Sequence, residues 1–278
     1  MCDCNRRASM IAELKILRDV ASYRLRRLEM ANLGGAFAIM VAVHLTTVEI
    51  AVRLAFGLAL NLLVYLNNDW HDRDEDVDAM GRERDKTRFL RAHPAEAVRA
   101  QLGLAALLGG FAALYGGGLW WPLLLGGGVC WAYSAVLKRR PFVDVIAMVV
   151  WGVTMPMVAL APGADAGWPL LWQLGLFSGV FETIQVVRDH DDDKRQGVRT
   201  TAVVLGPALT RRVTRLLCLL SAIWAAASFH AVLALPSLVA SALPMPAGQS
   251  SKTWNRVRLL FGLTFLAECA LVWWRGGV

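Results

Sequence analysis

The sequence predicts an all-α membrane protein, a bundle of about nine transmembrane helices. Hydrophobic residues make up 56% of its 278 positions and charged residues 18%, and the mean hydropathy is +0.45. An ordinary soluble domain is about 45–50% apolar and about 25% charged. Apolar segments near the ~20 residues that a transmembrane helix needs recur along the whole chain. They are continuous rather than alternating in hydrophobicity, which favours helices over a membrane barrel.

The first 29 residues differ from the rest in being charged throughout. Residues 10–29 place apolar side chains at helical spacing, with basic residues such as Lys15, Arg18 and Arg24 between them. This pattern is typical of an amphipathic helix lying on a membrane surface. The segment lacks the apolar core of a signal peptide. We therefore expect a cytoplasmic amphipathic segment over 1–29 and a single transmembrane domain over 30–278.

Six spans are expected in the first two thirds of the chain, and charge fixes the count beyond them. The six lie at about 30–46, 50–68, 98–115, 119–136, 143–160 and 168–187. Two basic clusters follow, Arg211 to Arg215 and Lys252 to Arg258. If both are cytoplasmic, an even number of spans separates them. The sequence therefore predicts a hairpin of two short spans within 213–245, turning between 228 and 235, and a ninth span over 259–274.

A cytoplasmic N-terminus places every basic cluster on the cytoplasmic side of this topology. The net charge of +7 then faces the anionic cytoplasmic leaflet, and we do not interpret it as a nucleic-acid footprint. The second and sixth spans end on this side. Between them they carry the densest runs of carboxylates in the chain.

Two series of oxygen-bearing side chains, spaced four residues apart, close the second and sixth spans. They are Asn68, Asp72 and Asp76, and Gln185, Asp189 and Asp193. On a helix each series occupies one face. Two acidic faces brought together repel each other unless a cation lies between them. Hard divalent ions such as Mg²⁺ take oxygen ligands and often bridge carboxylates to phosphates. The spacing predicts two acidic helix ends that hold Mg²⁺ and a diphosphate.

These motifs resemble those of the UbiA superfamily of intramembrane prenyltransferases. The run Asn68-Asp69-x-x-Asp72-x-x-x-Asp76 is similar to the first family motif. Asp189-x-x-x-Asp193, continued by Gly197-x-Arg199-Thr200-Thr201, is similar to the second. Between them, Tyr133-Ser134-x-x-Leu137-Lys138-Arg139-x-Pro141-x-x-Asp144 looks like a further family stretch. The resemblance extends from about Arg27 to Gly206.

The resemblance implies nine transmembrane helices around a central cavity that opens toward the cytoplasmic side, with a cap formed by the loops after the second and sixth spans. It also implies use of an allylic prenyl diphosphate with two Mg²⁺ ions. By matching position, the metal-binding residues are Asn68, Asp72, Asp76, Asp189 and Asp193. Lys138 would contact the diphosphate, and further substrate-binding candidates are Arg84, Arg88, Tyr133, Ser134, Gln185 and Arg199. Asp69 belongs to the first motif but points elsewhere on a helix, so we expect it to orient other groups rather than bind metal.

Three functions fit these residues. The first is a prenyltransferase that joins a prenyl group to an aromatic or other lipophilic acceptor. The second is a terpene cyclase acting on a C15 or C20 prenyl diphosphate with the same metal site, which the motifs cannot distinguish from a transferase. The third is a transporter that uses the carboxylates to bind ions. Departures from the family at Asp85, Phe89 and Gln185 leave the acceptor open, and the oligomeric state is not determined.

Aromatic and isolated charged side chains leave further alternatives open. Trp70, Trp131, Tyr133 and Trp151 could line the cavity and stabilise an allylic cation through their π-faces, or belong to an interfacial aromatic belt. Glu49 and Arg53 are spaced to pair across one helical turn. Glu268 lies within the ninth span, where a charged group is a functional candidate, and no partner for it can be identified.

Overall fold

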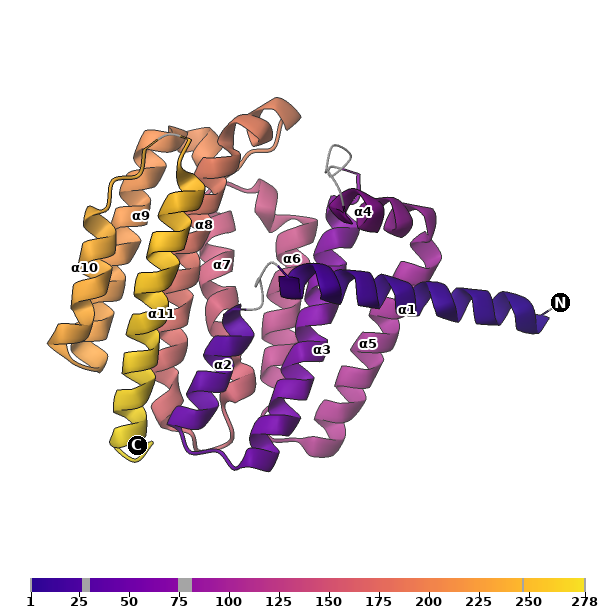
Figure 1. Cartoon of the computed structure of the whole chain (residues 1–278), viewed down its shortest axis with the longest axis horizontal. Coiled ribbons are helices and arrows are strands. Elements are labelled where there is room, and N and C mark those ends of the chain that lie inside the picture. Colours follow the sequence, from indigo (N-terminus) through magenta and orange to yellow (C-terminus); the bar gives the residue numbers. More distant parts are fainter. Residues whose placement is uncertain (1, 27–30, 75–81, 247, 278) are drawn as a thin grey trace.

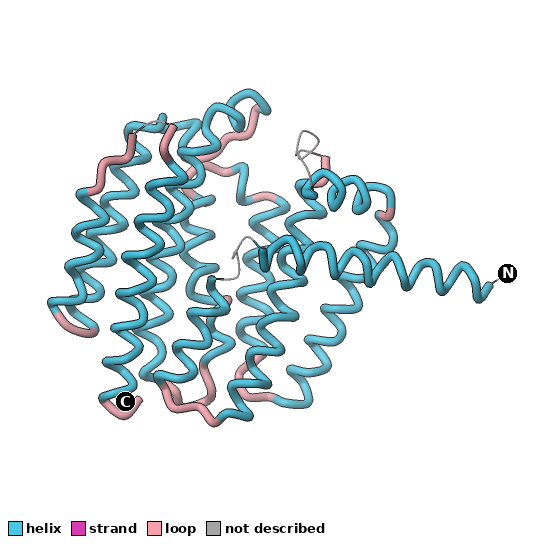
Figure 2. The backbone as a smooth tube through the Cα atoms, in the orientation of Figure 1, coloured by secondary structure: helices cyan, strands magenta, loops and turns pink. Residues whose placement is uncertain are grey.

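The chain folds entirely into helices in the part that the structure describes. The computed structural model describes residues 2–26, 31–74, 82–246 and 248–277, and these ranges contain no strand (Figure 2). The helices are α1 (Cys2–Arg26), α2 (Ala31–Ala42), α3 (Thr47–Asp72), α4 (Arg82–Ala92), α5 (Pro94–Tyr115), α6 (Gly127–Ala135), α7 (Val143–Thr154), α8 (Trp168–Gln196), α9 (Thr201–Ser228), α10 (Leu235–Ala242) and α11 (Ser250–Trp274). The all-α prediction is confirmed.

The long helices run side by side as a bundle, with α1 lying across it (Figure 1). Helix α8 packs against α7, α9 and α11, and α3 packs against α5 and α6. Helices α7 and α8 approach closely because glycines face each other. A Cβ added at Gly152 would lie 2.9 Å from the Cα of Gly175, so neither position accommodates a side chain. The ends of α3 and α8 that carry the acidic motifs lie on the same side of the bundle (Figure 1).

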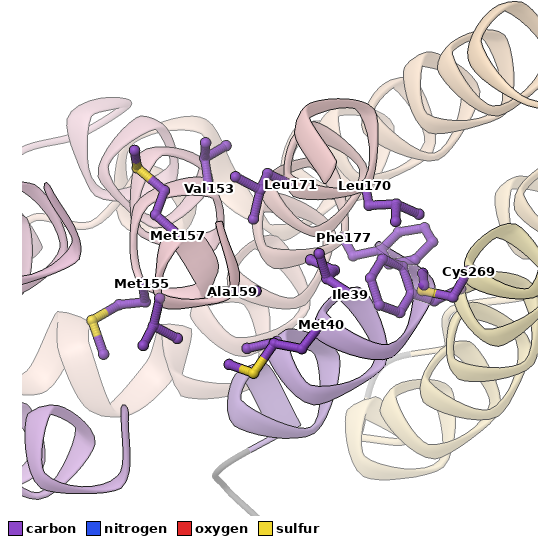
Figure 3. Packing of buried hydrophobic residues seen from close by; sticks show 14 of the residues in the cluster. Ile39, Met40, Val153, Met155, Met157, Ala159, Leu170, Leu171, Phe177 and Cys269 are labelled. Atoms are coloured by element: carbon purple, nitrogen blue, oxygen red, sulfur yellow. The ribbon is translucent and has the colours of Figure 1, made fainter. Parts of the chain in front are cut away.

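The main apolar core lies where α2, α8 and α11 meet. Figure 3 shows Ile39 and Met40 of α2 beside Leu170 of α8 and Cys269 of α11. The rings of Phe177 and Phe261 stack with their centroids 4.0 Å apart. Burial of this kind is the main source of rigidity in a helical bundle.

Four helices in the described ranges are long and apolar enough to cross a membrane. They are Thr47–Asp72, Pro94–Tyr115, Asp165–Gln196 and Ser250–Trp274. Three further apolar segments are shorter: Ala31–Ala42, Val143–Ala159 and Ala231–Ala242. The chain is therefore an integral membrane protein, whereas the count of nine spans and the cytoplasmic N-terminus stay predictions.

Several expected spans are shorter or interrupted. The first was expected over 30–46, but α2 has only 12 residues. The fourth opens with a π-helical turn over Pro122–Gly126 before α6 begins, and the fifth leaves the α-helix at Thr154 because Pro156 follows. Proline removes a backbone donor and clashes with the preceding turn, so it ends or distorts a helix.

The hairpin predicted within 213–245 turns where it was expected. Helix α9 ends at Ser228, a short 3₁₀ segment covers Ala231–Ala234, and α10 follows. The loop expected after the sixth span is much shorter than the interval 188–212 between that span and the hairpin. Helix α8 continues to Gln196 and α9 begins at Thr201, so Arg211, Arg212 and Arg215 lie on a helix. Gly206, at φ +76, and Pro207 interrupt its first turns.

Helix α1 packs on the bundle through one face. Ile16 and Val20 are buried in a second apolar cluster with Leu66 of α3, Leu90 of α4 and Ala97 of α5. Its outer apolar side chains include Ile11, which is 64% exposed. The buried face shows that α1 is part of the folded unit. Its position on a membrane surface stays a prediction.

Arg53 is fully buried near the end of α3 that is remote from the acidic motif. It does not pair with Glu49, which forms a capping box with Thr46 instead. Its guanidinium donates to the carbonyl oxygens of Val158 (3.1 Å), Leu160 (3.0 Å) and Gly117 (2.8 Å). One side chain thus joins three segments of the chain.

The Arg53→Met variant is expected to unfold at a clearly lower temperature in detergent. Three carbonyls, one buried and two partly buried, would lose a charged donor. An unsatisfied buried polar group costs about 1–3 kcal/mol, so we expect a loss of about 3 kcal/mol. Thermal unfolding followed by circular dichroism measures the change. Arg256→Met, at an exposed arginine of α11, is the matched control, and an equal loss in both variants would contradict the prediction.

Glu268 is completely buried in α11, and neither carboxyl oxygen has a hydrogen-bond partner among the described residues. The Glu268→Leu variant should be more stable than the wild type by about 1–3 kcal/mol, because it removes that unsatisfied group. Thermal unfolding in detergent measures this, with Glu268→Gln, which keeps the polar group, as the comparison. A strongly destabilised leucine variant would show that Glu268 has a partner in the working protein.

Candidate active site

The first acidic motif forms a connected set of side chains at the end of α3. Asn68 donates to Asp72 through Nδ2 at 3.1 Å, and Lys138 donates to the other oxygen of Asp72 at 2.9 Å. Ser134 of α6 donates to the amide oxygen of Asn68 at 3.3 Å. The structure thus brings together four residues that the sequence selected. Helix α3 ends at Asp72, and Asp76 lies outside the described residues.

The second motif lies on the last turns of α8, which contains Gln185, Asp189 and Asp193. Asp193 accepts a hydrogen bond from Thr200 at 3.2 Å. Asp189 accepts hydrogen bonds from Nε and Nη2 of the neighbouring Arg188, at 2.7 and 2.8 Å. The helix closes at Gly197, whose φ of +73 is the left-handed conformation that glycine adopts without strain.

Lys138 connects the two motifs electrostatically. It lies on a short 3₁₀ turn, Leu137–Arg139, that follows α6. Besides its ion pair with Asp72, it interacts electrostatically with Asp193 and with Glu182, both on α8. A single ammonium group is therefore bonded to a carboxylate of α3 and within electrostatic range of carboxylates on α8, so it can supply positive charge to a diphosphate that bridges the two helices.

Asp144 is a buried hydrogen-bond acceptor that links α7 to α9 next to the second motif, and this role was not predicted from the sequence. It is fully buried and accepts hydrogen bonds from the Thr201 backbone N–H at 2.7 Å and from the Thr201 hydroxyl. The Phe142 N–H donates to the same hydroxyl at 2.7 Å. These bonds fix the start of α9 to the start of α7. The sequence did contain a signal for this pair, because Asp144 and Thr201 each belong to a stretch that resembles a family motif.

Glu182 is a second residue that the sequence reasoning did not select. It is only 3% exposed and accepts a hydrogen bond from Tyr133 of α6 at 2.8 Å. It lies seven residues before Asp189 on α8, about 10 Å deeper along the helix axis. Tyr133 was expected to bind substrate, and the structure shows its hydroxyl bonded to this buried carboxyl group.

The remaining substrate-binding candidates lie outside the hydrogen-bonded set of Asn68, Asp72, Ser134 and Lys138. Arg84 and Arg88 are exposed on α4, Arg199 is exposed in the loop after α8, and Gln185 is half-buried. In the described ranges none of the four side chains forms a hydrogen bond or ion pair with the acidic motifs. Their roles as ligands of a substrate stay predictions.

The aromatic side chains that could line a cavity separate into different environments. Trp131 is 60% exposed, and it forms no hydrogen bond with the acidic motifs among the described residues. Trp70 packs in the cluster between α1, α3 and α5, with the Arg73 guanidinium 3.8 Å from its ring centre. Trp151 packs against the main core. Within the described ranges, the Tyr133 hydroxyl bonds to Glu182 of the site, and a cavity-lining role for the three tryptophans stays a prediction.

The donors at the two helix ends fit a hard divalent cation. They are carboxylate and amide oxygens, the ligands that Mg²⁺ prefers. Among the described residues no three Asp, Glu, His or Cys side chains lie close enough together to form a metal cage. Mg²⁺ usually binds one or two carboxylates together with substrate phosphates rather than a dedicated protein cage. Carboxylates that lie on two separate helix ends therefore suit a Mg²⁺ ion that binds together with a diphosphate.

An apolar groove opens at the side of the bundle between α2, α3 and α11. Its volume is about 630 Å³, and it is lined by Leu25, Ala31, Leu33, Gly34, Phe37, Leu54 and Arg258. Among the lining residues that the structure describes, Arg258 is the one with a charged side chain. The groove is large enough to receive part of a lipid-like molecule.

The fold and the site define a class: a helical membrane protein with paired acidic helix ends and a lysine between them. A sequence model of the UbiA prenyltransferase family matches residues 31–270, and the chain belongs to this family. Membership indicates a prenyltransferase-type enzyme. A comparison with curated protein sequences finds no match.

Solved structures show the same fold at low sequence identity. A UbiA homologue from Archaeoglobus fulgidus bound to GPP and Mg²⁺ has a TM-score of 0.65 and 18% identity, over 94% of this chain and 99% of that one. The same homologue bound to DMAPP and Mg²⁺ has a TM-score of 0.65 and 19% identity, over 94% of this chain and 98% of that one. A digeranylgeranylglyceryl phosphate synthase has a TM-score of 0.69 and 14% identity, over 94% of this chain and 98% of that one.

Proposed function

We propose that the protein is a Mg²⁺-dependent intramembrane prenyltransferase that ionises an allylic prenyl diphosphate and transfers the prenyl group to an aromatic or other lipophilic acceptor. The observation that carries this proposal is the position of Lys138, which pairs with Asp72 of the first motif at 2.9 Å and interacts with Asp193 of the second. Relatives with this fold are described as bound to GPP or DMAPP with Mg²⁺.

In this proposal some residues bind the metal ions and Lys138 stabilises negative charge on the diphosphate. Asn68, Asp72, Asp189 and Asp193, with Asp76, would hold the magnesium ions. Bound Mg²⁺ supplies positive charge that neutralises the departing diphosphate. Lys138 can exchange its bond with Asp72 for one to a diphosphate oxygen, and so stabilises negative charge where it develops.

The bonds that change are few. The allylic C–O bond breaks and its electron pair leaves with the diphosphate. The allylic cation is then attacked by the electrons of the acceptor, and a proton leaves the acceptor. Water would capture the cation, so the reaction needs a dry environment, which a site among membrane helices provides.

The groove between α2, α3 and α11 offers a path for lipophilic molecules. Apart from Arg258, the lining residues in the described part of the chain are apolar, so a prenyl tail or a lipid-like acceptor could enter from the bilayer side. A relative with this fold is described as a digeranylgeranylglyceryl phosphate synthase, which supports an acceptor of lipid character. None of the relatives named above is described as a cyclase, and no observation at the site favours cyclisation.

A product assay on purified protein tests the proposal and separates these reactions. Geranyl, farnesyl and geranylgeranyl diphosphates are supplied with Mg²⁺, with and without an aromatic or lipid acceptor, and the organic extract is analysed by mass spectrometry. Prenylated acceptor, formed only when acceptor is present, supports the transferase. A cyclic hydrocarbon formed without acceptor would mean a cyclase instead. Release of neither product, with ion transport that is lost in Asp72→Ala, would indicate a transporter.

A further inference from the structure

Asp69, the second residue of the first acidic motif, faces away from the site. It is 4% exposed overall and bonds to neither Lys138 nor Asp72. Adjacent residues on a helix point about 100° apart, so Asn68 can face the site while Asp69 faces the opposite elements. Those elements are α1 and α4.

Two cations from these two helices meet at its carboxylate. Arg24 of α1 pairs with Oδ1 of Asp69, and Lys86 of α4 pairs with Oδ2 at 2.8 Å. The side chains are 13%, 5% and 3% exposed for Arg24, Lys86 and Asp69. We call these three residues the Asp69 cluster. Because water is excluded, each pair depends on the other charges being in place.

Tyrosine rings surround the two cations. The Arg24 guanidinium lies 4.7 Å from the ring centre of Tyr65, and the Lys86 ammonium lies 4.4 Å from that of Tyr23. The cluster carries two positive charges and one negative charge. The electron-rich faces of the rings stabilise the excess positive charge.

The cluster also fixes how α4 is rotated about its axis. Lys86 and Leu90 lie four residues apart and are both buried, Leu90 in the apolar cluster with Ile16 and Val20. Arg84 and Arg88 lie two residues before and after Lys86, on another face of the helix, and both are exposed. The buried ion pair and the packed side chains of Thr87, Phe89 and Leu90 therefore set the direction in which the two arginines point.

We infer that Asp69 and Lys86 are positioning residues: they hold α4 so that Arg84 and Arg88 are presented to the diphosphate that the acidic motifs bind. Arg24 makes α1 part of the same support. The inference rests on the proposed function. In this arrangement the motif has two roles on two faces of α3: Asn68 and Asp72 face Ser134 and Lys138, and Asp69 binds the helix that carries Arg84 and Arg88.

Lys86→Met is the variant of choice because it leaves Asp69 and Arg24 as a balanced ion pair and should fold. With geranyl diphosphate and Mg²⁺, its KM should rise about 10–100-fold, the usual cost of losing a supporting contact to a site, while kcat stays within about threefold. Lys86→Arg should restore the wild-type KM. Arg91→Ala, which removes an exposed arginine of α4 that pairs with Asp74, is the matched control and should leave KM unchanged.

A double-mutant cycle separates positioning from general damage. If Lys86 acts through α4, Arg88→Ala should raise KM in the wild type but add almost nothing in the Lys86→Met background. The inference would be overturned if the effects of Lys86→Met and Arg88→Ala on KM were additive. It would also be overturned if Arg88→Ala alone left KM at the wild-type value.

Hydrogen–deuterium exchange gives a readout that does not depend on activity. Amides of residues 84–92 should exchange faster in Lys86→Met and in Asp69→Asn than in the wild type, and at the wild-type rate in Lys86→Arg. Unchanged exchange in all three variants would overturn the inference. If the wild type does not turn over prenyl diphosphate at all, the proposed function fails, and the exchange rates still decide whether the cluster holds α4.

Discussion

The Asp72→Ala variant is expected to lose at least about 10³-fold in kcat/KM for a prenyl diphosphate. Asp72 is the residue of the first motif that contacts both Asn68 and Lys138. A metal centre contributes several kcal/mol of charge stabilisation, and each 1.36 kcal/mol changes the rate tenfold. Diphosphate release and prenylated product, measured across Mg²⁺ concentrations, would report the loss.

Asp74→Ala is the matched control for this variant. It removes the same kind of side chain two residues further along, where the carboxylate is 63% exposed and pairs with Arg73 and Arg91. Exposed pairs of this kind contribute about 0–1 kcal/mol, so activity should change little. Equal activity in Asp72→Ala and Asp74→Ala would contradict the assignment of Asp72 to the metal site. Unfolding temperatures near that of the wild type would exclude a folding defect in either variant.

The second large effect is expected for Lys138→Met, with a fall in kcat of about 10²–10³-fold, the usual cost of removing one donor aimed at developing negative charge. Methionine keeps most of the length and the apolar stem of lysine but cannot donate to the diphosphate. The variant should still bind inorganic pyrophosphate in the presence of Mg²⁺, because the carboxylates remain. Isothermal titration calorimetry and single-turnover kinetics together measure the two properties.

Arg140→Met is the control for Lys138→Met. Arg140 is exposed and lies two residues from Lys138 in the same basic run. A loss of overall positive charge near the membrane would affect both variants alike, whereas charge stabilisation at the reacting bond depends on Lys138 alone. Equal loss of kcat in the two variants would therefore remove Lys138 from the proposed mechanism.

Residues that carry a local signal were identified from the sequence. The i, i+4 spacing of Asn68 with Asp72, and of Asp189 with Asp193, places each pair on one helix face wherever the helix falls. Lys138 and Ser134 were found through the stretch that resembles a family motif, and the structure joins both to the first acidic motif. Local periodicity and motif order were sufficient for these residues.

Several pairings between residues that are distant in sequence were not found. Glu182 meets Tyr133 across 49 residues, and Asp144 meets Thr201 across 57. No periodicity within one segment can reveal such pairs, because they depend on which helices become neighbours. The same reason explains Arg53, for which a partner one turn away was expected and three backbone carbonyls from other segments were found.

The sequence by itself determined the helical class, the membrane location and the two acidic helix ends, because hydropathy and four-residue spacing act within a segment. Tertiary structure decided which polar side chains are buried together. Asp69 shows the difference most clearly. Its place in the motif was visible, whereas its bonds to Arg24 and Lys86 arise only when α1 and α4 pack on α3. A buried ion pair forms where the packing of several elements excludes water, and that exclusion is a property of the assembled bundle.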